Sequence, residues 1–117
     1  MHEMTLVQSL LDMAEEELVR RDCKRLLLAR VEYGALVGVM PEALHCCFEI
    51  LTRGTVHENA RLELVRLPLR LRCPFCGVSF GEEVQDVLNI PCPVCGEFFG
   101  HIVEQGKEMI LSRLEAS

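Results

Sequence analysis

Four of the seven cysteines lie in two copies of one short motif. Each copy places two thiols around two intervening residues and ends at a glycine: Cys73-Pro74-Phe75-Cys76-Gly77 and Cys92-Pro93-Val94-Cys95-Gly96. A glycine at that point lets the chain turn tightly without a Cβ clash. Residues 77–91 separate the two inner cysteines, which is within the spacing of four-cysteine zinc sites. The sequence therefore predicts a metal site built from two knuckles.

Four thiolates suit a tetrahedral ion with no open coordination position, so the predicted site is structural rather than catalytic. We expect zinc as the ion and the four motif cysteines as its ligands: Cys73, Cys76, Cys92 and Cys95. The alternatives are a rubredoxin-like iron site, two disulfides, or four free buried cysteines. The duplicated motif argues against the last two, and the rest of the chain resembles no small electron carrier.

The start of the chain carries a second set of metal donors. Histidine at position 2 is bulky and normally leaves the initiator methionine in place, so the free amine belongs to Met1. The amine, the backbone nitrogens of His2 and Glu3, and the His2 imidazole can all reach one ion. Planar nitrogen donors suit nickel(II) or copper(II). Protons compete for the amine, since the pKa of an α-amino group is ordinarily about 7.7–8.0, so such a site is weak and releasable; the alternative is a frayed terminus.

Composition limits the class of protein. The 117 residues are half apolar, enough for one compact domain with an appendage. A net charge of -6 disfavours binding to a nucleic-acid backbone. No secretory signal or membrane span is evident, and seven cysteines then indicate a reducing, cytoplasmic location. The remaining thiols are predicted to be small buried hydrophobes: Cys23, Cys46 and Cys47.

Apolar periodicity predicts the elements that position these motifs. A helix is expected over residues 4–21, starting at a capping box formed by Thr5 and Gln8. A strand over 25–33 follows, and Pro41 fits the first turn of a second helix. The buried side of that helix is predicted to carry three apolar residues: Leu44, Phe48 and Leu51.

A second strand starts near Arg61, and its alternation slips by one residue near Pro68, which indicates a bulge or a change of domain. The last strand is expected over 108–115. The predicted fold class is α+β: a small three-stranded sheet packed with two helices, plus an inserted four-cysteine zinc-ribbon-like module. The predicted domains are 1–69 with 101–117, and 70–100. The insert is too short for its own core, so metal must hold it together.

No catalytic constellation is visible. The chain lacks a Ser-His-Asp arrangement and a phosphate-binding glycine loop, so an enzyme is not predicted. Three histidines are isolated in the sequence. We expect His45 on a helix surface, His57 in a loop, and His101 in a polar role beside the second knuckle.

Several motifs together resemble the hydrogenase nickel-incorporation family, HypA/HybF. They are Met1-His2-Glu3-Met4, Tyr33-Gly34, Pro41-Glu42-Ala43-Leu44 with Phe48-Glu49, the two Cys-x-x-Cys pairs, and Gly106-Lys107-Glu108-Met109. The resemblance covers essentially the whole chain. It implies a nickel metallochaperone for [NiFe]-hydrogenase and, in some members, urease. It also implies nickel bound by Met1, His2 and Glu3, and zinc bound by the four motif cysteines.

The resemblance implies two partners, the GTPase HypB and the hydrogenase large-subunit precursor. We expect the GTPase to dock on the first domain, and exposed strand edges would support a homodimer. Two positions depart from the family pattern, because Ala35 stands where members often have an acid and Met40 stands where some members have one. The alternative function is a zinc-ribbon module that binds protein or nucleic acid without transporting metal. A row of arginines favours this alternative: Arg61, Arg66, Arg70 and Arg72.

Overall fold

The computed structural model describes residues 3–81, 91–97 and 100–117. The chain divides into two compact units. The first unit comprises residues 1–32, 38–65 and 110–117, and the second unit comprises 33–37 and 66–109. These units reflect packing within the structure, so the domain boundaries given above remain predictions. Neither helix in the described ranges has the length and apolar character needed to span a membrane.

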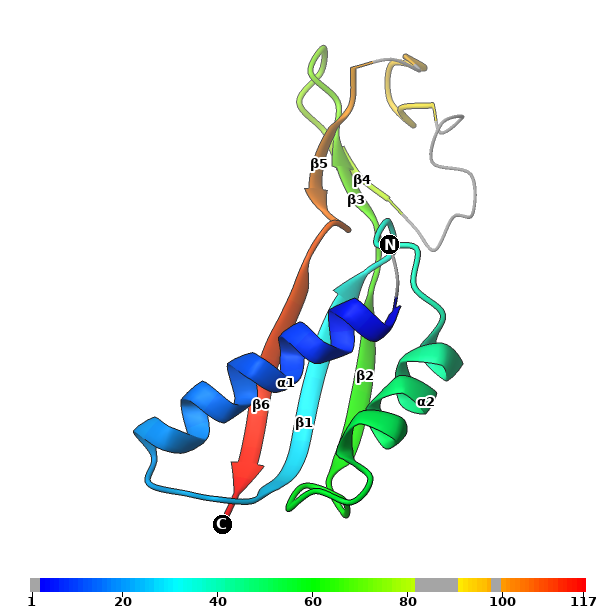
Figure 1. Cartoon of the computed structure of the whole chain (residues 1–117). Coiled ribbons are helices and arrows are strands. Elements are labelled where there is room, and N and C mark those ends of the chain that lie inside the picture. Colours follow the sequence, from blue (N-terminus) through cyan, green and yellow to red (C-terminus); the bar gives the residue numbers. More distant parts are fainter. Residues whose placement is uncertain (1–2, 82–90, 98–99) are drawn as a thin grey trace. The chain divides into compact units, whose positions relative to one another are not determined.

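The first unit contains the predicted three-stranded sheet with its two helices. The strands lie in the order β2-β1-β6, so the last strand joins the first two as predicted. Figure 1 shows both helices on one face of this sheet, with β1 and β2 in the same direction and β6 opposed. The elements are α1 (Glu3–Arg20), β1 (Leu26–Gly34), α2 (Pro41–Thr52), β2 (Arg61–Leu67) and β6 (Met109–Ala116).

Helix α1 buries one apolar stripe against the unit and exposes its acidic face. The buried residues follow helical spacing: Val7, Leu10, Leu11, Ala14 and Leu18. The predicted capping box is wrong, because α1 already includes Glu3 and therefore encloses Thr5. Gln8 instead donates a hydrogen bond to Asp12 one turn later, at 3.1 Å. An N-cap residue must lie outside the helix, and Thr5 does not.

Helix α2 begins at Pro41, as predicted, because a proline in the first turn removes no intrahelical hydrogen bond. Leu44 and Phe48 are buried. The third buried residue is Thr52 rather than Leu51, which is only half-buried. The Thr52 hydroxyl donates to the Phe48 carbonyl at 2.8 Å, so its polar group is satisfied within the helix.

His57 lies in the turn before β2, as predicted, but its side chain is buried to 7% exposure. Its Nδ1 accepts a hydrogen bond from the Leu26 N–H at 3.0 Å, at the start of β1. Its Nε2 lies 3.6 Å from a Glu15 carboxylate oxygen on α1. This histidine thus ties the central strand to the turn, which is a structural role within the first unit.

The second unit holds a separate antiparallel sheet in the order β4-β3-β5. Its strands are β3 (Arg70–Arg72), β4 (Ser79–Phe80) and β5 (Ile102–Gln105). Leu71 is buried and lies opposite Phe80 and Val103 in the register. The predicted break near Pro68 is confirmed, since β2 ends at Leu67 and β3 begins at Arg70.

Two glycines cross at close range in the second unit. A Cβ added to Gly34 would lie 2.1 Å from the carbonyl carbon and oxygen of Gly106. The Leu36 N–H donates to the Gly106 carbonyl at 2.7 Å, which fixes this crossing. Any side chain at position 34 would therefore collide with backbone, so the chain needs glycine there.

Glu108 secures the turn at this crossing, and its loss should destabilise the protein. Its Oε1 accepts hydrogen bonds from the N–H groups of Gly106 at 2.7 Å and Lys107 at 2.8 Å. These bonds, the one from Gly106 foremost, lower the pKa of Glu108. A carboxyl with a depressed folded-state pKa contributes stability above its unfolded pKa of about 4.3 and loses it as pH falls. We expect Glu108→Gln to lower the unfolding free energy by about 1 kcal/mol at neutral pH.

Urea denaturation of wild type and variant at neutral pH and near pH 4 measures this effect. The difference between the two proteins should begin to shrink at the lower pH, because the carboxyl of Glu108 is protonated in the unfolded chain before it is protonated in the folded one. The matched control is Glu63→Gln, which removes an exposed carboxylate on β2. Equal losses of unfolding free energy in the two variants would show that Glu108 contributes only through the net charge of the protein and not through its hydrogen bonds.

Candidate metal centre

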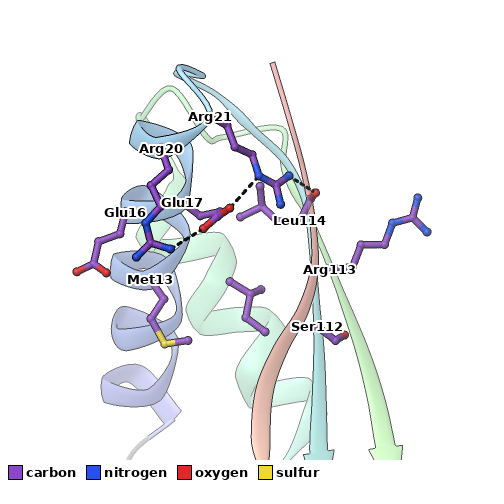
Figure 2. Close-up of a pocket in the computed structure, with 9 residues that line it drawn as sticks. Met13, Glu16, Glu17, Arg20, Arg21, Ser112, Arg113 and Leu114 are labelled. Atoms are coloured by element: carbon purple, nitrogen blue, oxygen red, sulfur yellow. Dashed lines mark hydrogen bonds and ion pairs between the residues drawn. The ribbon is translucent and has the colours of Figure 1, made fainter.

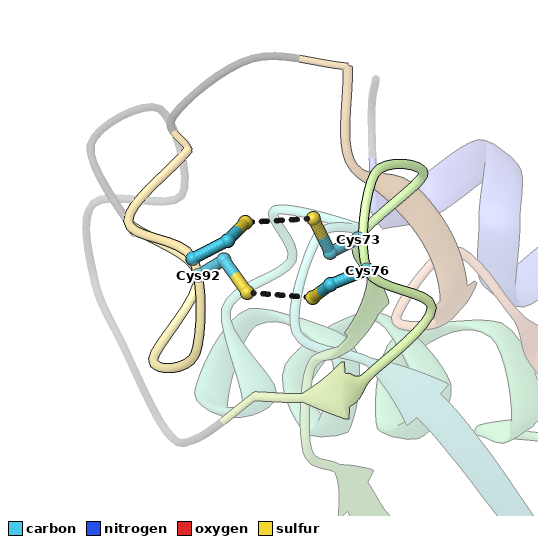
Figure 3. Close-up of side chains that lie close together, drawn as sticks. Cys73, Cys76 and Cys92 are labelled. Carbon is cyan, nitrogen blue, oxygen red and sulfur yellow. Dashed lines mark hydrogen bonds between the residues drawn. The ribbon is translucent and has the colours of Figure 1, made fainter.

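The structure brings the four motif cysteines together (Figure 3). Their sulfur atoms all lie within 4.8 Å of one another. The Sγ of Cys73 is 3.5 Å from that of Cys95, and the Sγ of Cys76 is 3.4 Å from that of Cys92. Among the residues that the structure describes, this is the one cluster of three or more histidine, cysteine or acidic side chains close enough to share an ion.

The two knuckles share one backbone design. The N–H of Gly77 donates to the Cys73 carbonyl, and the N–H of Gly96 donates to the Cys92 carbonyl, both at 2.9 Å. The two glycines have φ of 76° and 75°, in the left-handed region where a side chain is strained. The glycine that ends each motif is therefore required by the turn that aims both sulfurs inward.

Burial differs within each knuckle in the same way. Cys73 and Cys92 are buried, at 0% and 2% exposure, whereas Cys76 and Cys95 are exposed. The first cysteine of each motif thus anchors the knuckle in the second unit. The second cysteine closes the site on the solvent side.

The thiols differ in acidity when no cation is bound. Burial opposes ionisation of Cys92, but hydrogen bonds from the N–H groups of Cys95 and Val94 outweigh it and lower the pKa of Cys92 to about 6. For Cys95, the N–H of Glu97 favours ionisation, yet partial desolvation of its sulfur and the neighbouring thiols together raise its pKa to about 12. The Cys92 thiolate thus forms easily and opposes ionisation of Cys76 and Cys95. A bound divalent cation would relieve this repulsion between thiolates.

The donor set fits a tetrahedral ion. Zinc–sulfur distances of about 2.3 Å place ligand sulfurs about 3.8 Å apart, close to the separations seen here. All four positions are filled by protein, so no position is left for a substrate. The arrangement suits structural metal binding.

The other three cysteines lie elsewhere, and their predicted burial is wrong. Cys46 is exposed on α2, while Cys23 and Cys47 are half-buried. Cys46 and Cys47 differ in exposure, because they point to different sides of the helix. The helical spacing of α2 could have revealed that Cys46 is exposed. Cys46 lies two positions from each of the buried residues Leu44 and Phe48, and therefore on the opposite face of the helix.

The predicted nickel ligands lie mostly outside the described residues. Met1 and His2 are not described, and Glu3 is the first described residue of α1, where it is half-buried. The first N–H groups of a helix have no intrahelical acceptor, so the Glu3 nitrogen is free of that competition. The nickel site remains a prediction.

Two positions, Ala35 and Met40, are expected to depart from the family pattern. Ala35 lies after the end of β1, and Met40 lies at the start of α2. Met40 is the N-cap residue of α2, where its side chain makes no capping hydrogen bond and is 64% exposed. Ala35 follows β1 and is half-buried. Glu42 lies exposed in the first turn of α2, near Met40 in sequence.

The other two described histidines differ in their surroundings. His45 is exposed on α2, as predicted. His101 packs edge-on against the ring of Phe80, with centroids 5.0 Å apart and an interplanar angle of 87°. Neither belongs to the four-sulfur cluster.

Comparison with known proteins identifies the family. A family model described as "Hydrogenase/urease nickel incorporation, metallochaperone, hypA" matches residues 1–116. The chain belongs to the HypA family. Hydrogenase maturation factor HypA from Lawsonia intracellularis is 38% identical over 116 residues, 98% of each chain. The protein of the same name from Solidesulfovibrio magneticus is 36% identical over 115 residues, also 98% of each.

Solved structures of HypA proteins agree with the fold. The solution structure of the nickel metallochaperone HypA from Helicobacter pylori has a TM-score of 0.70 and 26% identity, covering 99% of this chain and 97% of that one. A second HypA solution structure has a TM-score of 0.72 at the same identity. These matches confirm the predicted family and fold class. The HypA family consists of hydrogenase maturation factors.

Proposed function

We propose that this chain carries nickel(II) and delivers it during [NiFe]-hydrogenase maturation, while a structural zinc ion holds its second unit together. One observation supports this most strongly: the HypA match runs over residues 1–116 and so includes both the N-terminal motif and the cysteine cluster. The family function is that of a maturation factor that supplies metal. We therefore assign no catalytic residues.

Zinc is the ion that we assign to the four cysteines. Four sulfurs at these separations suit its tetrahedral coordination and leave no open position. Among the described residues of the second unit, few apolar side chains outside the cluster are buried, and Leu69 and Leu71 are two of them. Bound zinc would stabilise the four thiolates and join the two knuckles, which are separate segments of the chain.

Nickel is the cargo, and we assign it to the N-terminus. The amine of Met1, the backbone nitrogens of His2 and Glu3, and the His2 imidazole are the donors. Nitrogen donors suit nickel(II), and competition with protons near neutral pH favours release. A closed site of four thiolates would retain its ion. The retained zinc and the transferred nickel are therefore assigned to different ligands.

The partners in this proposal are the GTPase HypB and the hydrogenase large-subunit precursor, in the cytoplasm. We place the GTPase contact on the nickel-binding domain, 1–69 with 101–117, because the cargo is handed over where it is bound. The zinc module, 70–100, would recognise the target. Urease maturation and a homodimer are extensions of the same proposal.

A deletion strain tests the function. Cells that lack this chain and grow with limiting nickel should lose most [NiFe]-hydrogenase activity, and a plasmid copy should restore it. Added nickel should partly replace the chain, because a carrier raises the local supply rather than performing a reaction. Full hydrogenase activity in the deletion strain at limiting nickel would contradict the proposal.

A further inference from the structure

The solvent face of β3 presents two arginines beside a small cavity. Arg70 and Arg72 are exposed, while Leu71 between them is buried, so both guanidinium groups project from one face of the strand. Figure 1 shows β3 in the middle of its sheet, between β4 and β5. The two arginines are therefore flanked by a strand on each side.

The register places an apolar neighbour beside this pair. Arg72 lies opposite Ser79 on β4 and Ile102 on β5. Ile102 is 43% exposed, so a large apolar side chain lies at the surface beside Arg72. A cavity of about 280 Å³ lies here, lined by Arg72, Cys73, Pro74, Gly77 and Ile102. We call Arg70, Arg72, Pro74 and Ile102 the arginine face.

Several arginines elsewhere in the described residues are already paired. In a groove of the first unit between α1 and β6, Arg20 and Arg21 both bind the carboxylate of Glu17, and Arg21 also donates to the Leu114 carbonyl (Figure 2). On α2, Arg53 binds Glu49. These contacts use the charge of those arginines within the protein, so their surroundings indicate no external ligand.

The two arginines of the arginine face are not paired in this way. Within the described ranges, Arg70 and Arg72 have no ion pair and no side-chain hydrogen bond. The acid on the same face is Glu104, and it accepts a hydrogen bond from the Ser79 hydroxyl at 2.6 Å. Two exposed guanidinium groups next to an apolar cavity are complementary to carboxylates that flank an apolar side chain.

We propose that the arginine face docks an acidic, extended segment of a partner protein. The carboxylates of the segment bind Arg70 and Arg72, and an apolar side chain enters the cavity beside Ile102. A guanidinium group matches a carboxylate in shape and can bind it through two parallel hydrogen bonds. The inference rests on the proposed role of the zinc module in recognising a target and names the chemistry of the segment it binds; it holds for any metal at the N-terminus.

A protein segment fits this face better than nucleic acid does. Two arginines neutralise few phosphates, whereas stable binding to a nucleic-acid backbone uses many such contacts. The chain as a whole has a net charge of -6, which repels a polyanion. A short acidic segment is affected less by the net charge of the chain, because solvent ions screen charges that lie beyond about 8 Å.

Fluorescence polarisation with the zinc-loaded full chain tests the proposal. The probe is a fluorescein-labelled peptide in which glutamates flank one leucine. We expect saturable binding that weakens about tenfold in Arg72→Gln and in Arg70→Gln, since each removes one charge-assisted contact. The matched control Arg53→Gln removes an exposed arginine on α2 and should leave binding unchanged. Arg72→Lys keeps the charge but loses the planar group, so its binding should be intermediate.

Four outcomes would overturn the proposal. They are an absence of saturable binding, an equal loss in Arg53→Gln, equal binding of a peptide with glutamines in place of the glutamates, and tighter binding of single-stranded DNA of equal charge. Zinc content and nickel titration of each variant serve as folding and function controls. The zinc content and the nickel binding of each variant should match wild type. A failure of peptide docking is then distinguished from a failure of the proposed nickel function.

Discussion

Removal of zinc from the four cysteines is expected to unfold the second unit and leave the first unit folded. The first unit has its own apolar core, with residues such as Val7, Val31 and Leu44 fully or almost fully buried. In the second unit, two of the most buried side chains are the metal ligands Cys73 and Cys92 themselves. Structural zinc contributes an apparent binding free energy of about 10–16 kcal/mol in small modules, far above what so small a core supplies.

Amide hydrogen exchange on Cys92→Ser and on chelator-treated wild type measures this effect. Amides of β3 and β5 should lose their protection, while those of α1 and α2 keep it. The matched control is Cys46→Ser, which makes the same change at an exposed cysteine outside the cluster. Retained protection in β3 after complete zinc loss would show that the unit folds without metal.

The second large effect concerns nickel. We expect His2→Ala to abolish nickel binding while zinc content and fold stay unchanged. Loss of groups that merely support a metal ligand costs 10–100-fold in affinity, so loss of the imidazole ligand itself should exceed about 100-fold. Equilibrium dialysis of nickel against the purified proteins measures the change.

His45→Ala is the control for the nickel prediction. It removes an exposed histidine on α2, so it tests whether any surface imidazole contributes. Nickel binding should be the same as in wild type. If His2→Ala still binds nickel one to one with wild-type affinity, the N-terminal assignment is wrong.

The metal cluster and the main sheet were predictable from sequence for clear physical reasons. The duplicated cysteine motif fixes ligand spacing, and the structure gathers the four sulfurs as predicted. Long alternating or helical apolar patterns predicted α1, β1 and the return of β6 to the sheet. Such patterns average over many residues, so a single misleading residue does little harm.

Short elements and individual side chains were harder to predict. Strand β4 has two residues and β5 has four, too few for an alternation to be visible. The buried role of His57 depends on the Leu26 N–H, a partner distant in sequence. The false capping box at Thr5 arose because the spacing of two residue types cannot show that the helix starts earlier.

The most direct test of the nickel-carrier account is a calorimetric nickel titration of untagged protein beside a variant with one extra residue before Met1. The added residue displaces the amine and leaves every side chain in place. We expect nickel binding to collapse in the extended protein while zinc content stays the same. Unchanged nickel binding would contradict the N-terminal site and with it the proposed mode of transport.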